Sequence, residues 1–198
     1  MSITSTTDKN DWEILANWAA YCGSDVIELN LSCPNKWLDG QPVGMVADDP
    51  EAIVHIVALV RSVVGVDMRL SVKLPPYSST IPPRILSALQ AININMFVSC
   101  NTAGGHPTTI DGEQVLSMPQ AGLSGPALCT HSVQQVSYLH KVIPNIPVIG
   151  VGGISSGADA KRFLDADAIG FCIGTHFFLN GPKVFGEVVQ ELVDLTED

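Results

Sequence analysis

Side chains able to move protons or bind a polar ligand stand at the ends of several apolar, β-branched runs. The stretch "IELNLSCPNKW" delivers Asn30, Cys33 and Asn35, "SVKLPPY" carries Lys73, and "FVSC" is followed directly by Asn101. A cysteine in such a turn could be a nucleophile, a proton-transfer base, a metal ligand or an ordinary small residue. A lysine at a strand end could hold its charge for a ligand or extend it into solvent.

Glycine turns on two consecutive predicted strands indicate an anion site. "VIGVGGISSG" runs from a strand through Gly152 and Gly153 into the start of a helix, and Gly174 with Thr175 follows the next strand. Backbone N–H groups that no side chain obstructs, aimed from a helix start, suit a phosphate. Barrels often hold phosphate between the loops that follow their last two strands. Two such turns therefore favour a phosphate site over a plain tight turn.

The elements that must position these residues alternate along the chain. Short apolar, β-branched runs predict strands over 25–31, 68–74, 95–100, 147–151 and 168–174. Amphipathic spacing predicts helices over 11–21, with Asn10 or Asp11 as N-cap, and over 50–64, 82–91, 131–142, 157–165 and 182–195. We therefore predict an α/β fold with a parallel sheet and helices outside it, as a single domain over residues 1–198.

Ligands of parallel α/β folds bind at the carboxyl ends of the strands, where the polar residues above collect. Strand alternation puts Glu28 on the face of Asn30, so we expect Glu28 to pair with Lys73 if their strands are neighbours. "AGGHPTTIDGEQ" and "PQAGLSGPAL" are loop-like, and long ordered loops are usually functional. His106 in the first of them is expected to face solvent.

Composition narrows the class of protein. A formal net charge of -10 and a pI near 4.7 argue against a nucleic-acid partner. The sequence has no apolar stretch of membrane-spanning length and no secretory signal, so we expect a soluble, cytoplasmic protein without a membrane partner. Five cysteines without CxxC spacing argue against a disulfide framework, a zinc site or an iron–sulfur cluster.

The blocks "ELNLSCPN", "VKLPPY", "SCNTAGG", "GLSGPAL" and "PVIGVGGISSG" have the order and spacing of the dihydroorotate dehydrogenase family, and the chain resembles its class 1, cysteine-base type. The start "SITSTTDKNDW" is also similar to the flavin domain of dihydropyrimidine dehydrogenase. The resemblance implies an FMN-bearing (β/α)8 TIM-type barrel that oxidises dihydroorotate to orotate in pyrimidine biosynthesis. Reaction with another pyrimidine, and a non-catalytic flavin-binding or structural role, remain the alternatives.

The resemblance also implies roles for individual residues. Cys33 matches the base that removes the C5 proton while hydride passes from C6 to flavin N5, and the lack of a histidine within the motif argues against a nucleophilic Cys–His pair. Lys73 matches the lysine that stabilises the reduced flavin. The pyrimidine-binding positions are Asn30, Asn35, Asn101 and Thr102. The FMN-binding positions are Asn30, Lys73, Cys100, Gly125, Val151, Gly152, Gly153, Gly174 and Thr175.

Compared with the family pattern, the chain starts near the end of the third barrel strand and so implies a partial barrel of about five to six strands. The family's early lysine and its closing loop are outside the match. An open barrel exposes strand edges and an apolar interior. We therefore expect a homo-oligomer, or a second chain that supplies the missing strands. The electron acceptor stays open among fumarate, NAD through a partner and oxygen.

Overall fold

The computed structural model describes residues 1–33, 36–38, 41–76, 81–105, 111–117 and 121–197. Its centre is a six-stranded sheet in which every pairing is parallel, in the order β1-β2-β5-β6-β9-β10. The strands are β1 (Ser2–Ile3), β2 (Val26–Asn30), β5 (Arg69–Leu74), β6 (Met96–Ser99), β9 (Val148–Val151) and β10 (Gly170–Cys172). The predicted parallel α/β fold is confirmed, with β1 added to the strands that periodicity indicates.

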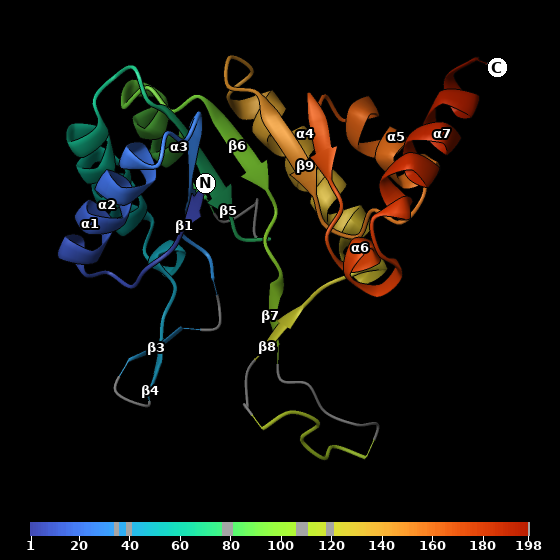
Figure 1. Cartoon of the computed structure of the whole chain (residues 1–198), viewed down its shortest axis with the longest axis horizontal. Coiled ribbons are helices and arrows are strands. Elements are labelled where there is room, and N and C mark those ends of the chain that lie inside the picture. The colour runs from blue at the N-terminus through green and yellow to red at the C-terminus, as the bar shows by residue number, and fades with distance from the viewer. Residues whose placement is uncertain (34–35, 39–40, 77–80, 106–110, 118–120, 198) are drawn as a thin grey trace.

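Helices connect the strands and lie beside the sheet (Figure 1). They are α1 (Lys9–Tyr21), α2 (Pro50–Val64), α3 (Pro83–Ala91), α4 (Cys129–Val142), α5 (Gly157–Asp165), α6 (Thr175–Asn180) and α7 (Lys183–Glu197). The predicted bounds of α2 and α5 are confirmed, and α6 was not predicted. The N-cap predicted for α1 is wrong, because Asp8 takes that role and its side chain accepts from the main chain of Asn10.

The two faces of the sheet differ in chemistry. One face packs under the helices in a single hydrophobic cluster, which takes alternate residues of the strands: Ile27, Leu29, Leu70, Val72, Leu74, Phe97 and Val148. The opposite, inner face carries Glu28, Asn30, Ser71 and Lys73, the intervening residues of β2 and β5. Burial of the apolar face at roughly 25 cal/mol per Å² stabilises the fold, and the polar residues of β2 and β5 lie on the other face.

Two short antiparallel ribbons extend from the end of the sheet where β2 and β6 finish (Figure 1). One pairs β3 (Lys36–Leu38) with β4 (Gln41–Val43), and the other pairs β7 (Ala103–Gly105) with β8 (Ala121–Leu123). The ends of the two stretches predicted as loops therefore pair with each other. The sequence signal was weak because the ribbon strands are short and glycine-rich.

Arg61 of α2 stabilises the opposite, amino-terminal edge of the sheet. It is 8% exposed and donates to the carbonyl oxygens of Gly65, Met68, Ile92 and Asn93 at distances between 2.6 and 3.2 Å. These carbonyls belong to the segments that lead into β5 and β6. Main-chain acceptors thus satisfy this guanidinium, and the edge is a structural one. None of the described helices is both long and apolar enough to span a bilayer.

Candidate active site

Strand register brings the predicted catalytic and binding residues to one edge of the sheet. Asn30 ends β2 and is the register partner of Lys73 on β5. Lys73 is in turn the partner of Val98 on β6, and Asn101 follows that strand by two residues. Three neighbouring strands therefore deliver an amide, an ammonium and a second amide at their carboxyl ends, which is the ligand edge of parallel α/β folds.

A hydrogen-bond network joins the two amides. Asn101 Nδ2 donates to Asn30 Oδ1 at 2.8 Å, to the carbonyl oxygen of Ser32 at 3.0 Å and to Ser32 Oγ at 3.1 Å. The main-chain N–H of Thr102 donates to Asn101 Oδ1 at 2.8 Å. Asn101 is 9% exposed, so these bonds replace water for a buried amide and hold it in one orientation.

Ser32 is the residue that sequence reasoning missed at this edge. Its side chain is fully buried, and its hydroxyl also donates to the carbonyl oxygen of Lys73 at 3.3 Å. The signal available in the sequence was its place inside the "NLSCPN" block, next to Cys33. A serine there reads as a turn residue, and only the fold shows that its hydroxyl contacts the ends of two other strands.

Cys33 lies directly after Ser32, at the same edge, as a half-buried free thiol. The thiol is partly exposed, and the preceding residue, Ser32, belongs to the hydrogen-bond network. Asn35, predicted to bind the pyrimidine, and His106, predicted to face solvent, lie outside the described residues.

Lys73 provides positive charge to the inner face. The predicted pair with Glu28 does not form within the described chain, where Glu28 Oε1 instead accepts from Ser2 Oγ at 2.6 Å. The pKa of the Cys172 thiol on β10 is raised by burial and by Glu28, while the charge of Lys73 lowers it.

Cys100 lies near both Lys73 and the first glycine turn. It is 3% exposed, its Sγ lies 3.1 Å from Ser132 Oγ, and its main-chain N–H donates to the carbonyl oxygen of Val151. Burial raises the pKa of the Cys100 thiol, which the Ser132 hydrogen bond and the Lys73 charge partly offset. A Cβ on Gly152 would lie 2.3 Å from Ser132 Oγ, so only glycine fits there.

Three of the four residues predicted to lie near the phosphate line a separate small pocket, and Gly152 is not among its lining residues. A cavity of about 80 Å³ is lined by Gly125, Gly153, Gly174 and Thr175, all predicted from the sequence. Ser155 and His176 also line it and were not predicted. Their signal was weak, because Ser155 reads as part of a helix start and α6 was missed.

Gly153 is required for the shape of this pocket. Its φ is +83°, and an added Cβ would lie 2.7 Å from both the carbonyl oxygen of Gly125 and the main-chain nitrogen of Cys129. The main chain therefore approaches itself closely where the pocket wall forms. Main-chain groups that no side chain obstructs are suited to a phosphate group.

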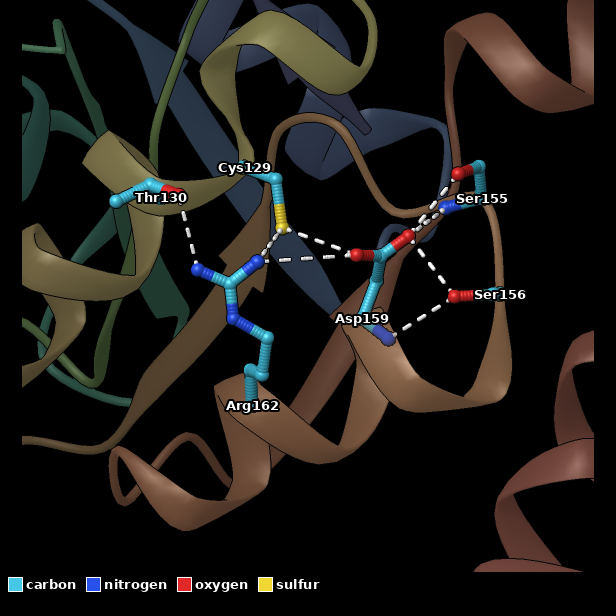
Figure 2. Close-up of polar contacts among 6 residues, drawn as sticks. All are labelled: Cys129, Thr130, Ser155, Ser156, Asp159 and Arg162. Atoms are coloured by element: carbon cyan, nitrogen blue, oxygen red, sulfur yellow. Dashed lines mark hydrogen bonds and ion pairs between the residues drawn. The ribbon is translucent and has the colours of Figure 1, made fainter.

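Asp159 of α5 holds the loop that leads from this pocket into the helix (Figure 2). Its Oδ2 accepts from the main-chain N–H and the hydroxyl of Ser155 and from the hydroxyl of Ser156, at 3.0 to 3.1 Å. Its Oδ1 lies 3.5 Å from Cys129 Sγ and 3.8 Å from Arg162 Nη1. Burial acts to raise the pKa of Asp159, but these hydrogen bonds outweigh it and hold the pKa below its ordinary value.

A parallel α/β sheet with polar groups and a glycine-lined pocket at its carboxyl edge is typical of ligand-binding α/β enzymes, TIM barrels among them. The family model "Dihydroorotate dehydrogenase" matches residues 2–195. This chain belongs to the dihydroorotate dehydrogenase family. Members of that family are flavoproteins and oxidoreductases built on a TIM barrel, of which this chain forms a part.

Curated relatives support this family assignment. The chain is 33% identical over 182 residues to "Dihydroorotate dehydrogenase B (NAD(+)), catalytic subunit" of Pyrococcus horikoshii, covering 88% of this chain and 56% of that protein. It is 37% identical over 154 residues to the protein of the same name in Methanocella arvoryzae, covering 77% and 49%. It is 30% identical to "Dihydroorotate dehydrogenase A (fumarate)" of Limosilactobacillus reuteri, covering 93% and 62%. The chain thus spans about half the length of these relatives.

Proposed function

We propose that this chain catalyses the FMN-dependent oxidation of dihydroorotate to orotate. The name of its family states the oxidation of dihydroorotate. The observation that supports this most strongly is the arrangement of Asn30, Lys73 and Asn101 on three adjacent strand ends, with Cys33 beside them. A pyrimidine presents carbonyl and N–H groups around a flat ring, and paired amides complement such a pattern. The site offers both a polar edge for binding and a thiol for proton transfer.

The residues present fit an FMN. The pocket of Gly125, Gly153, Gly174 and Thr175 is suited to the phosphate end, because its wall is formed by main chain that a Cβ would block. Lys73 lies on the inner face, where its positive charge would stabilise negative charge on a bound ring. When bound, FMN supplies the acceptor for the hydride that leaves C6 of dihydroorotate.

Cys33 is the proposed base. As a thiolate it takes the proton from C5 of dihydroorotate, and the new C5–C6 double bond of orotate forms as the C6 hydride departs. Proton abstraction needs the deprotonated form of the base, so the rate of orotate formation should fall in acid. Asn30 holds the substrate against this thiol. Thr102 lies next to Asn101, within reach of the same substrate edge.

Residues 1–198 are proposed to form one domain, since a single hydrophobic cluster runs from Ile3 on β1 to Val188 on α7. A partner, either a second copy or a second chain, is proposed to cover exposed aromatic surface. Trp18 on α1 is 61% exposed, and Phe178 on α6 is 87% exposed. The names of the archaeal relatives, which are called catalytic subunits, support this. The cytoplasm is the proposed compartment.

The experiment is an anaerobic reaction of the purified chain with FMN and dihydroorotate, followed by chromatography for orotate. Formation of orotate in step with loss of the flavin absorbance at about 450 nm supports the proposal. Dihydrouracil serves as the comparison substrate. Bleaching by dihydrouracil but not by dihydroorotate would assign the site to a different pyrimidine. No bleaching with either, in a chain that binds FMN, would contradict the proposed activity.

A further inference from the structure

The hydroxyl of Ser32 both donates and accepts a hydrogen bond inside the protein. It donates to the carbonyl oxygen of Lys73 at 3.3 Å and accepts from Asn101 Nδ2 at 3.1 Å. The side chain is fully buried, so water does not compete for either bond. One hydroxyl therefore joins the carboxyl ends of β2 and β5 to Asn101, two residues after β6.

The network fixes which atom of the Asn30 amide faces inward. The main-chain N–H of Thr102 can only donate, so the atom of Asn101 that it contacts at 2.8 Å is the amide oxygen. The NH2 group of Asn101 must then face Ser32 and Asn30. The Asn30 atom 2.8 Å away accepts this NH2 group and is therefore its Oδ1. This leaves Asn30 Nδ2 as the outward group.

The outward NH2 of Asn30 is available to a ligand. Asn30 is partly exposed on the inner face, and within the part of the chain that the structure describes its Nδ2 has no hydrogen-bond partner. Its main-chain carbonyl oxygen is already used, because Thr4 Oγ1 donates to it at 2.8 Å. The strand end and the amide are therefore both held, while two N–H donors point to the site.

We propose that Ser32 is a positioning residue that stabilises the polarity of Asn30, which the main-chain N–H of Thr102 sets through Asn101. By holding the NH2 of Asn101, it keeps Asn30 Oδ1 turned inward and Asn30 Nδ2 turned toward the ligand. The ligand atom opposite Asn30 is then an acceptor, a carbonyl or carboxylate oxygen, and not an N–H group. This role of Ser32 extends the proposed function. It rests on the proposed function only for the identification of the ligand as a pyrimidine.

Ser99 on β6 provides a matched control. It is also fully buried and near the carboxyl end of its strand, but its Oγ has no hydrogen-bond partner among the described residues. Ser32→Ala and Ser99→Ala remove the same atom from equally buried sites. Only Ser32→Ala deprives Asn101 and Lys73 of a partner, so a difference between the two variants reports the network and not the loss of a buried oxygen.

The first test follows solvent exchange of side-chain NH2 protons by NMR in the full chain, labelled with ¹⁵N-asparagine. The Asn101 NH2 should exchange slowly in the wild type and in Ser99→Ala. In Ser32→Ala we expect exchange at least about tenfold faster, because one of its acceptors is gone. Equal exchange in Ser32→Ala and Ser99→Ala would overturn the role of Ser32. This test needs neither flavin nor activity.

The second test uses orotate as the probe, with FMN present at saturation. Ser32→Ala should bind orotate about tenfold more weakly than Ser99→Ala, the factor that one hydrogen bond supplies. In Asn101→Asp the carboxylate would draw the NH2 of Asn30 inward, so the orotate-induced shift of that NH2 resonance should disappear. Persistence of the shift would overturn the orientation argument. A wild type that ignores orotate contradicts the proposed function, while the exchange result still decides the role of Ser32.

Discussion

Two regions of the carboxyl edge each depend on one polar side chain that collects several hydrogen bonds, and the two differ in charge. At the ends of β2, β5 and β6 this side chain is the neutral amide of Asn101. After β9 this side chain is the carboxylate of Asp159, which accepts hydrogen bonds from Ser155 and Ser156 (Figure 2). It lies beside Cys129 and Arg162. Each holds a segment that faces the proposed ligand.

The difference in charge has a physical consequence. An amide has fixed donors and an acceptor, so it can set the polarity of a neighbouring amide at any pH near neutrality. A carboxylate only accepts, which suits it to bind N–H and O–H groups of a turn. The hydrogen bonds that a carboxylate accepts weaken when it is protonated. The pyrimidine side should therefore be insensitive to acid in a range where the phosphate side loosens.

The largest expected effect concerns the thiol beside the neutral network. Cys33→Ala should lower the rate of orotate formation by about 10²–10⁴-fold, the contribution of a positioned base. Flavin binding should stay unchanged, since Cys33 is not part of the phosphate pocket. Stopped-flow reduction of the flavin measures the rate. Cys22→Ala, which removes an exposed thiol after α1, is the control. A Cys33→Ala rate within threefold of that control would contradict the assignment of the base.

The next effect concerns the phosphate side. Gly153→Ala forces a side chain onto a φ of +83° and within 2.7 Å of main-chain atoms, so the pocket wall must shift. We expect FMN affinity to fall by at least about tenfold, measured by quenching of flavin fluorescence. Gly104→Ala is the control, because its Cβ meets nothing within 4 Å. Equal FMN affinity in the two variants would show that the pocket does not bind the phosphate.

The charge difference itself is tested with Asp159→Asn. The pKa of Asp159 is lowered in the folded protein, so its stabilisation is fully present above the ordinary value of about 3.9 and is lost as pH falls through the lowered value. The variant should be less stable than the wild type at pH 7 by ~1–3 kcal/mol, measured by urea unfolding. The gap should narrow below about pH 3.9. A gap that is constant with pH would contradict the charged role.

The smallest effect separates capping from ligand binding. Ser156 is the N-cap of α5, and its hydroxyl accepts from the main-chain N–H of Asp159 at 3.1 Å. Ser156→Ala should cost about 1 kcal/mol of unfolding free energy and leave FMN affinity within about twofold of the wild type. Thermal unfolding and flavin titration measure the two. A large loss of FMN affinity without loss of stability would place Ser156 in the pocket.

Much of the fold could be predicted because its signals are local. Apolar periodicity and helix caps placed α2 and α5 at their observed bounds. The ligand-facing candidates Asn30, Lys73 and Asn101 were predicted because they end apolar runs. Asp159 was missed as an organising residue because it reads as an ordinary acidic residue in the first turn of α5, although its bonds to Ser155 and Ser156 are local. Ser32 was missed because its role arises from a contact 69 residues away along the chain. Such contacts leave no periodic trace in a single sequence.

The central claim is that one flavin spans both regions, with its ring beside Lys73 on β5 and its phosphate in the pocket that Gly153 lines. The most direct measurement is an FMN titration of the full chain, followed by flavin fluorescence, for the wild type, Lys73→Ala and Gly153→Ala. We predict that the wild type binds FMN stoichiometrically and that each variant weakens binding by about tenfold or more. Failure of the wild type to bind, or weakening by only one of the two substitutions, would contradict the claim.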